Sequence, residues 1–91
     1  MKVNVRIPMP LYNLTKGKSL VNVEANNLRE LIDILDAEFP GFKEKVCDKE
    51  YNLRKFINIF LNGEDIRFLE GLETKLSDGN SVTIITAVAG G

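Results

Sequence analysis

The sequence predicts an α+β domain in which one main helix lies across one face of a mixed β-sheet. Three observations predict this class: the chain is short, its apolar residues alternate with polar ones near both ends, and they recur at helical spacing in between. A chain of 91 residues is large enough for one compact core and too small for two. Its composition, 44% hydrophobic and 27% charged, is typical of a globular protein that folds by itself.

The first half of the chain predicts a β-hairpin followed by the main helix. Alternation over residues 2–7 predicts a strand that Pro8 ends, and alternation over residues 21–24 predicts its antiparallel partner. The helix is predicted to begin after Asn27, a typical capping residue, and to end at Pro40. Its apolar stripe consists of Leu28, Leu31, Ile32, Leu35 and Phe39.

The second half of the chain predicts the rest of the sheet. A short helical turn is expected over residues 42–46, and the apolar run at residues 56–61 predicts the strongest strand. The Asn-Gly pair at residues 62–63 predicts a tight turn, and Ile66 and Phe68 predict the start of a short return strand. Residues 82–85 predict the last strand.

One face of this sheet is predicted to be uncovered, because a single main helix can cover only the other face. Strand alternation divides the side chains between the two faces. On the helix side it places Ile57, Ile59, Leu61, Val82 and Ile84. On the open side it leaves Phe56, Phe60 and Ile85, beside Asn4, Arg6 and Thr83. Large apolar groups on an open sheet favour a surface that docks partners, for which the candidate residues are Phe60, Ile85 and Arg6. The alternative is the scattered surface apolar residues that every protein has.

Charge and composition exclude several classes of function. With 12 Lys and Arg against 13 Asp and Glu, the chain has no basic field for a nucleic-acid partner. The absence of histidine removes the usual general base and the commonest metal ligand, so we expect no bound metal or cofactor. The single cysteine, the lack of a signal-peptide pattern and the lack of a membrane-length apolar run predict a cytoplasmic protein without a membrane partner. We expect a monomer when the chain is free.

Three local patterns resemble functional motifs and are interpreted as structural. The Gly-Lys-Ser of residues 17–19 is similar to the end of a P-loop, but that motif needs glycine where this chain has Tyr12. Cys47 has no histidine to activate it and is interpreted as a small, partly buried apolar residue. An acidic stretch lacks the spacing of a calcium loop and is interpreted as a solvated surface. It contains Glu64, Asp65, Glu70, Glu73 and Asp78.

The sequence ends with Gly90 and Gly91, shortly after the last predicted strand. We therefore divide the chain into a domain over residues 1–85 and a flexible tail over residues 86–91. Because glycine has no Cβ, its backbone can enter a slot too narrow for any other residue and leave the terminal carbonyl open to attack. At about 3.3 Å per extended residue, the tail would reach roughly 20 Å into another protein.

The second half of the chain also carries a family pattern. Residues 56–68 read FINIFLNGEDIRF, residues 78–84 read DGNSVTI, and the sequence ends in AVAGG. On these residues the chain resembles the MoaD/ThiS sulfur carriers, which are small ubiquitin-like β-grasp proteins, over essentially its whole length. It looks most like the CysO-type branch, which serves thiocarboxylate-dependent cysteine synthesis. The ending VAGG is also that of the small subunit of molybdopterin synthase.

The resemblance implies a carrier protein rather than an enzyme. It implies that a ubiquitin-activating-like adenylyltransferase uses ATP to adenylate the carboxylate of Gly91, which is then converted to a thiocarboxylate. By position, Gly90 gives slender access, and Ala87, Val88 and Ala89 thread the partner's channel. The implied sulfur acceptor is a cysteine-synthase-like enzyme, a thiazole synthase or the large subunit of molybdopterin synthase.

By the same resemblance, Ile85 matches the exposed residue that such carriers use against their activating enzyme. The chain departs from the family at Thr86, where proline is usual. Three other readings stay open at this point: the small subunit of molybdopterin synthase, a ubiquitin-like protein modifier, and a β-grasp interaction domain whose glycines occur by chance.

Overall fold

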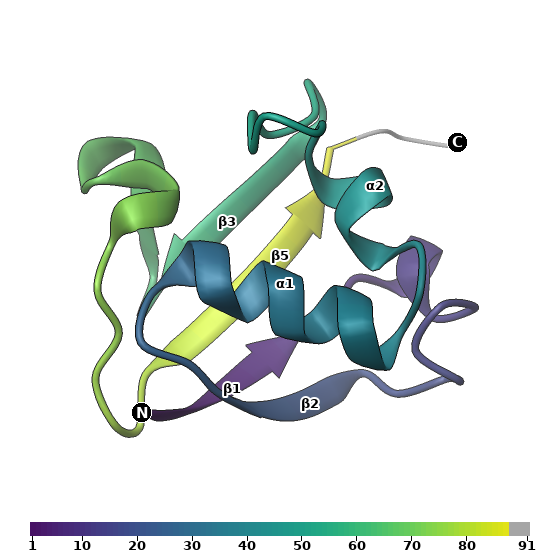
Figure 1. The fold of residues 1–91 in the computed structure, drawn as a ribbon, viewed down its shortest axis with the longest axis horizontal. Helices are drawn as coiled ribbons and strands as arrows, with labels where there is room; N and C mark the ends of the chain where they lie inside the picture. The colour runs from purple at the N-terminus through teal and green to yellow at the C-terminus, as the bar shows by residue number, and fades with distance from the viewer. Residues whose placement is uncertain (88–91) are drawn as a thin grey trace.

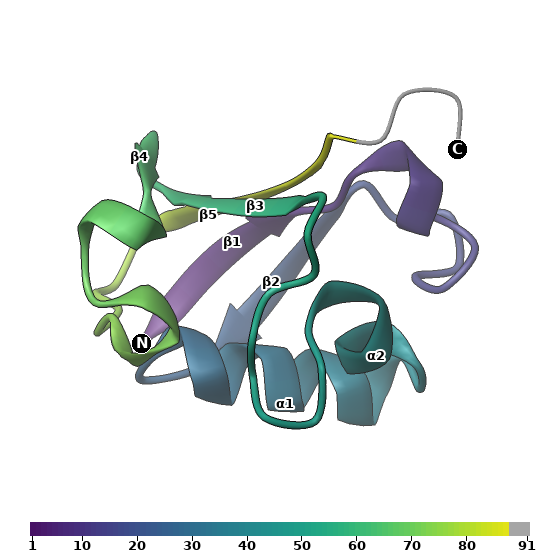
Figure 2. The same cartoon turned by 90° about the horizontal axis from the view of Figure 1, so that it is seen from above.

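A computed structural model describes residues 1–87 of the chain. One main helix, α1, lies across a five-stranded sheet (Figure 1), and the view turned by 90° shows the sheet and the helices as two layers (Figure 2). The fold class predicted from the sequence is therefore confirmed. The helices are α1 (Leu28–Glu38) and α2 (Phe42–Val46), with 3-10 turns η1 (Met9–Leu11), η2 (Ile66–Phe68) and η3 (Gly71–Glu73). The strands are β1 (Lys2–Arg6), β2 (Leu20–Glu24), β3 (Ile57–Leu61), β4 (Glu64–Asp65) and β5 (Ser81–Thr86).

The strands lie in the order β2-β1-β5-β3-β4. The first strand, β1, pairs antiparallel with β2, which confirms the predicted hairpin, and parallel with β5. On its other edge β5 pairs antiparallel with β3, which turns back through β4. The last strand thus lies in the centre of the sheet, with a neighbouring strand on each side.

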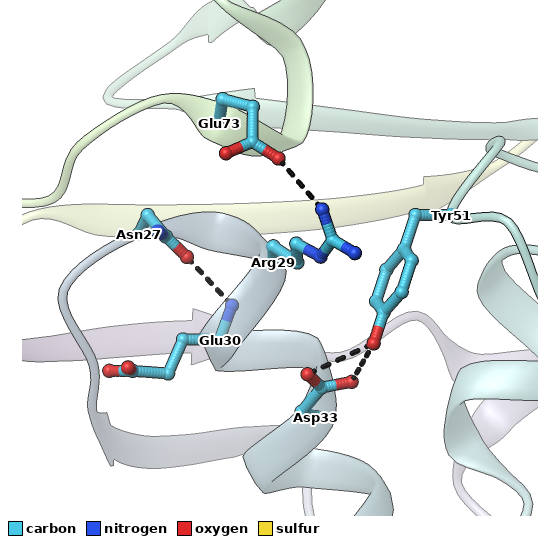
Figure 3. Close-up of polar contacts among 6 residues, drawn as sticks. All are labelled: Asn27, Arg29, Glu30, Asp33, Tyr51 and Glu73. Carbon is cyan, nitrogen blue, oxygen red and sulfur yellow. Dashed lines mark hydrogen bonds and ion pairs between the residues drawn. The ribbon is translucent and has the colours of Figure 1, made fainter.

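Helix α1 begins where the sequence predicts, because its first turn is capped. The Asn27 side-chain oxygen accepts a hydrogen bond from the Glu30 backbone N–H at 2.8 Å (Figure 3), and the Glu30 carboxylate accepts one from the Asn26 backbone N–H at 2.8 Å. The apolar stripe of the helix faces the sheet, and its residues Leu28, Leu31, Ile32 and Leu35 are buried. No helix among residues 1–87 is long and apolar enough to span a membrane.

The loop between α2 and β3 is fixed to the outer face of α1 by Tyr51. Its hydroxyl donates a hydrogen bond to the Asp33 carboxylate at 2.8 Å (Figure 3). The Arg29 guanidinium and the Lys43 ammonium lie 4.1 and 3.8 Å from the centroid of the tyrosine ring, so cation–π contacts add to the hydrogen bond. Arg29 also forms an ion pair with Glu73 at 3.3 Å. These contacts hold the loop that leads into β3.

The predicted return strand at Ile66 and Phe68 was wrong. The return strand is Glu64–Asp65, and residues 66–68 form the 3-10 turn η2. The reason is local, because the Asp65 carboxylate accepts a hydrogen bond from the Arg67 backbone N–H at 2.9 Å and so caps a turn at that point. The Asn-Gly turn before β4 has positive φ at both residues, as a tight hairpin requires.

The last strand is longer than the sequence predicted, since it includes Thr86. Thr86 lies opposite Ile57 of β3, and the next residue, Ala87, donates its backbone N–H to the Phe56 carbonyl at 2.7 Å. Thr86, which was assigned to the tail, is therefore part of the sheet, and the predicted division into a domain and a tail stays a prediction. Because residues 87 and 56 form a hydrogen-bonded pair, the adjacent pair of Thr86 and Ile57 is a non-hydrogen-bonded one.

Candidate functional site

The open face of the sheet carries one row of side chains that crosses all the strands. Cross-strand pairing places Arg6 opposite both Leu20 and Thr83, and Thr83 opposite Phe60. Phe60 in turn lies opposite Asp65. Cross-strand partners share a face, so this row lies on the side of the sheet that faces away from α1. Arg6 is exposed and Phe60 is half-buried.

Ile85 lies diagonally next to Phe60 on the same face, because its direct partner is Asn58, two residues before Phe60. The side chain of Ile85 is 41% exposed. The two predicted docking residues are therefore brought together. Arg6 lies farther away, two strand spacings from Phe60 or roughly 10 Å, with Thr83 between them.

The two faces of the sheet differ as the alternation predicts. On the helix side, Ile57, Ile59, Val82 and Ile84 are buried. Leu61, which was also expected there, is half-buried and packs at the margin of the core. The open face thus holds the large apolar groups that are free to contact another molecule.

The chain end that the sequence analysis singled out starts at the rim of this face. Ala87 is exposed and is the last residue that the structure describes. Its backbone hydrogen bond to Phe56 fixes the point from which the chain leaves the sheet. Val88, Ala89, Gly90 and Gly91, the other predicted tail residues, lie outside the described residues.

Two motifs from the sequence are confirmed as structural. Cys47 ends α2 and is fully buried, and burial raises the pKa of its thiol, which disfavours the reactive thiolate. It is more deeply buried than the sequence predicted. The Gly-Lys-Ser segment at residues 17–19 leads into strand β2 rather than into a helix, so it has no helix N-terminus to offer a phosphate.

The acidic stretch is used in separate pairings. The Asp65 carboxylate contacts the Arg67 guanidinium at 2.6 Å, and these hydrogen bonds lower the pKa of Asp65. Glu73 pairs with Arg29. Within residues 1–87 no three potential ligand side chains are grouped as a metal site.

Two exposed apolar residues near the site were not among the predicted site residues. Leu20, 50% exposed, lies beside Arg6 on the open face, and alternation with the buried Val21 and Val23 could have identified it. Phe56, 46% exposed, comes just before β3 and holds Ala87 through its carbonyl. Its proximity to the chain end depends on the pairing of β3 with β5, which no local pattern reveals.

Comparisons with known proteins agree with this geometry. A model of the ThiS family matches residues 5–91. The sulfur carrier protein CysO of Mycobacterium tuberculosis is 42% identical over 93 aligned positions that cover 100% of both chains. A chain in the crystal structure of the BexX/CysO complex from Amycolatopsis orientalis superimposes with a TM-score of 0.90 at 39% identity, covering 98% of this chain and 99% of that one. The small archaeal modifier protein 1 of Methanosarcina acetivorans superimposes with a TM-score of 0.83 at 30% identity, covering 99% of this chain and 96% of that one.

Proposed function

Because the chain belongs to the ThiS family and is a sulfur carrier protein with the ubiquitin-like β-grasp fold, we propose that it carries sulfur on the carboxyl group of Gly91. The observation that supports this site is the central position of β5, from which the chain leaves the domain and ends four residues after Ala87 in two glycines. Glycine adds no side chain that would keep the terminal carboxyl group out of a narrow active site.

The chemistry follows from the low reactivity of a carboxylate. An oxygen of the Gly91 carboxylate attacks the α-phosphorus of ATP and displaces pyrophosphate, which gives an acyl-adenylate. Sulfide then attacks the acyl carbon, forms the C–S bond and expels AMP, which leaves a thiocarboxylate directly. The terminal sulfur of this group is an ionised, soft nucleophile that can be passed to an acceptor.

The catalytic groups for these steps belong to the partner enzymes in this proposal. The carrier supplies the reacting carboxyl group and the surface that the enzyme recognises, and ATP is a substrate of the partner adenylyltransferase rather than a cofactor of the carrier. Cys47 supports this division, because the single thiol of the chain is buried and burial raises its pKa, which disfavours the thiolate that a sulfur relay needs. A free thiol also supports a reducing compartment such as the cytoplasm.

The docking surface is the open face of the sheet beside the chain end. Phe60 and Ile85 form its apolar centre, and Arg6 adds a positive charge at its margin. An apolar centre with a polar margin is the usual composition of a protein interface. The same surface serves the adenylyltransferase and the sulfur acceptor in turn, because both must receive the same chain end.

For the acceptor we propose a cysteine-synthase-like enzyme, since the relatives named CysO match the whole chain. A second candidate function is that of a ubiquitin-like modifier, which is supported by the similarity to small archaeal modifier protein 1. The two differ in product, because a modifier forms an amide with a lysine of another protein. If the chain is a modifier, digests of the source cells would contain branched peptides in which its C-terminal Gly-Gly is joined to a lysine, in place of a carrier that ends in a free thiocarboxylate.

The test is the intact mass of the carrier after incubation with the cognate adenylyltransferase, ATP and a sulfide donor. We expect the mass to rise by the difference between one sulfur and one oxygen atom. The matched control is a chain that lacks Gly91, whose mass should not change. An unchanged mass of the full chain while the enzyme hydrolyses ATP in its presence would contradict the proposal.

A further inference from the structure

A hollow lies at the point where the chain leaves the sheet, next to the Phe60 and Ile85 surface, and it extends to the helix side of the sheet. Its volume is about 430 Å³, within the range of binding pockets. The elements around it come together at one end of the molecule, where the end of β5, helix α2 and the turn η1 meet (Figures 1 and 2). The residues of its lining that matter here are Pro10, Leu11, Lys45, Phe56, Ile57 and Thr86.

The lining is apolar with one positive charge at its rim. Phe56 is 46% exposed although it is a large aromatic residue, and Pro10 also lines the hollow. Lys45 is exposed on α2, and neither of the two ion pairs among residues 1–87 involves it. This combination suits an apolar side chain that is flanked by a carboxylate.

The hollow extends from Phe56, which alternation places on the open side with Phe60, to the helix side of the same strand end. Thr86 and Ile57 form a cross-strand pair. Strand alternation places this pair on the helix side of the sheet, like Val82 and Ile84, whereas it places Ile85 on the open side. A molecule that holds the chain end would therefore contact the strand from both sides.

The short distance from Ala87 to the reacting group brings a bound enzyme close to the hollow. Ala87 is fixed at its rim by the hydrogen bond to the Phe56 carbonyl at 2.7 Å. Only four residues follow Ala87, and fully extended they span about 13 Å. An enzyme whose active site encloses the last of these residues must place part of its own surface within that distance of the hollow.

We infer that the hollow is a second docking site for the adenylyltransferase, which inserts an apolar side chain against Phe56 and sets a carboxylate against Lys45. The inference rests on the proposed function, because it takes the enzyme that adenylates Gly91 as the occupant. Together with Phe60 and Ile85, the hollow lets that enzyme grip the base of the tail from both faces of the sheet.

The test measures ATP–pyrophosphate exchange by the cognate adenylyltransferase as a function of carrier concentration. The variants are Phe56→Ser and Lys45→Glu, which change side chains only and leave the Phe56 carbonyl that holds Ala87. Matched controls are Phe68→Ser, at an 81% exposed phenylalanine on η2 at the other end of the molecule, and Lys75→Glu, at another exposed lysine. Circular dichroism verifies that each variant is folded.

We expect each hollow variant to raise the KM for the carrier about tenfold with kcat unchanged, since the lost contact is present in both the bound complex and the transition state. The effect of Lys45→Glu should shrink at high salt, and that of Phe56→Ser should not.

Unchanged KM values for both variants would overturn the inference while exchange by the wild type continues to support the proposed function. Concentration-dependent dimers of the free carrier that Phe56→Ser dissolves would also overturn it, because the occupant would then be a second copy of the chain. No exchange with the wild-type carrier would overturn the proposed function and the inference together.

Discussion

Replacing Phe60 with aspartate tests the docking surface most sharply, because it changes the centre of that surface without touching the chain end. Phe60 is half-buried on the open face, between Thr83 and Asp65 of the neighbouring strands and diagonal to Ile85. The substitution removes an apolar side chain that the partner would cover and places a carboxylate there instead. It also puts the new carboxylate directly opposite Asp65.

The magnitude follows from the burial of Phe60. Complete burial of a phenylalanine side chain contributes about 1.5–3 kcal/mol, so the part of Phe60 that is still exposed, about a third at most, can contribute up to about 1 kcal/mol to binding. A charged group buried at the interface without a partner costs at least about 2–3 kcal/mol more. The sum of about 3–4 kcal/mol corresponds to a dissociation constant for the adenylyltransferase that is raised at least 100-fold.

The cost to the fold is smaller. Repulsion between the new carboxylate and Asp65 adds about 0.2–1 kcal/mol, and the lost intramolecular packing adds about 1–2 kcal/mol. The free energy of unfolding of a small domain is about 5–15 kcal/mol, so the Phe60→Asp variant should stay folded at 25 °C. A thermal melt followed by circular dichroism checks this.

The assay is isothermal titration calorimetry of the purified adenylyltransferase with the wild-type carrier, with Phe60→Asp and with Phe68→Asp. Phe68 is 81% exposed on η2, away from the open face, and its variant carries the same change in charge. We expect this control to bind within about twofold of the wild type. Equal affinity for a folded Phe60→Asp variant would refute the assignment of the open face as the docking surface.

Three further predictions concern the chain end, the main helix and the thiol. Thr86→Pro should keep the fold, because the Thr86 backbone N–H takes no part in the pairing with Ile57. It should raise the free energy of unfolding by about 0.4–1 kcal/mol, since proline restricts the unfolded chain. A lower melting temperature than that of the wild type would contradict the register. Asn27→Ala should lower the free energy of unfolding by about 1 kcal/mol and the melting temperature by about 4–8 °C, since the Glu30 backbone N–H loses its acceptor. An unchanged melting temperature would show that the cap does not stabilise the domain. Cys47 should react with iodoacetamide only as fast as the domain opens, and rapid alkylation of the native protein at pH 8 would contradict its burial. Burial raises the pKa of the Cys47 thiol in the folded state. The protonated thiol therefore contributes fully to stability below the ordinary thiol pKa, and this contribution is lost as the pH rises above that pKa. The Cys47→Ala variant should lack this pH dependence.

Features that depend on local chemistry could be predicted from the sequence. Asn27 and Glu30 cap α1 through contacts three residues apart, so the start of the helix is written in the residues themselves. The opposite faces of Ile59 and Phe60 follow from strand alternation in the same way. The adjacency of Phe60 and Ile85 needed one further assumption, namely that the strand with Phe60 pairs with the last strand, and the register confirms it.

Features that depend on distant segments or on competing local contacts could not be predicted. Ile66 and Phe68 have the spacing of a strand, but the hydrogen bonds of Asp65 with Arg67 favour a turn over extended backbone. The contact of Tyr51 with α1 joins residues 18 apart and requires a positive φ of 66° that no tyrosine pattern signals. The hollow at the chain end is formed by four segments that meet only in the folded domain.

The central claim is that sulfur is carried on the last carboxyl group of the chain. Fragmentation of the intact, sulfide-treated carrier in a mass spectrometer tests it directly, because each fragment that keeps the C-terminus reports whether it holds the added sulfur. The account predicts that the mass increase is present in the smallest C-terminal fragment, which contains only Gly91. A mass increase that remains with Cys47, or with any fragment that lacks Gly91, would contradict it.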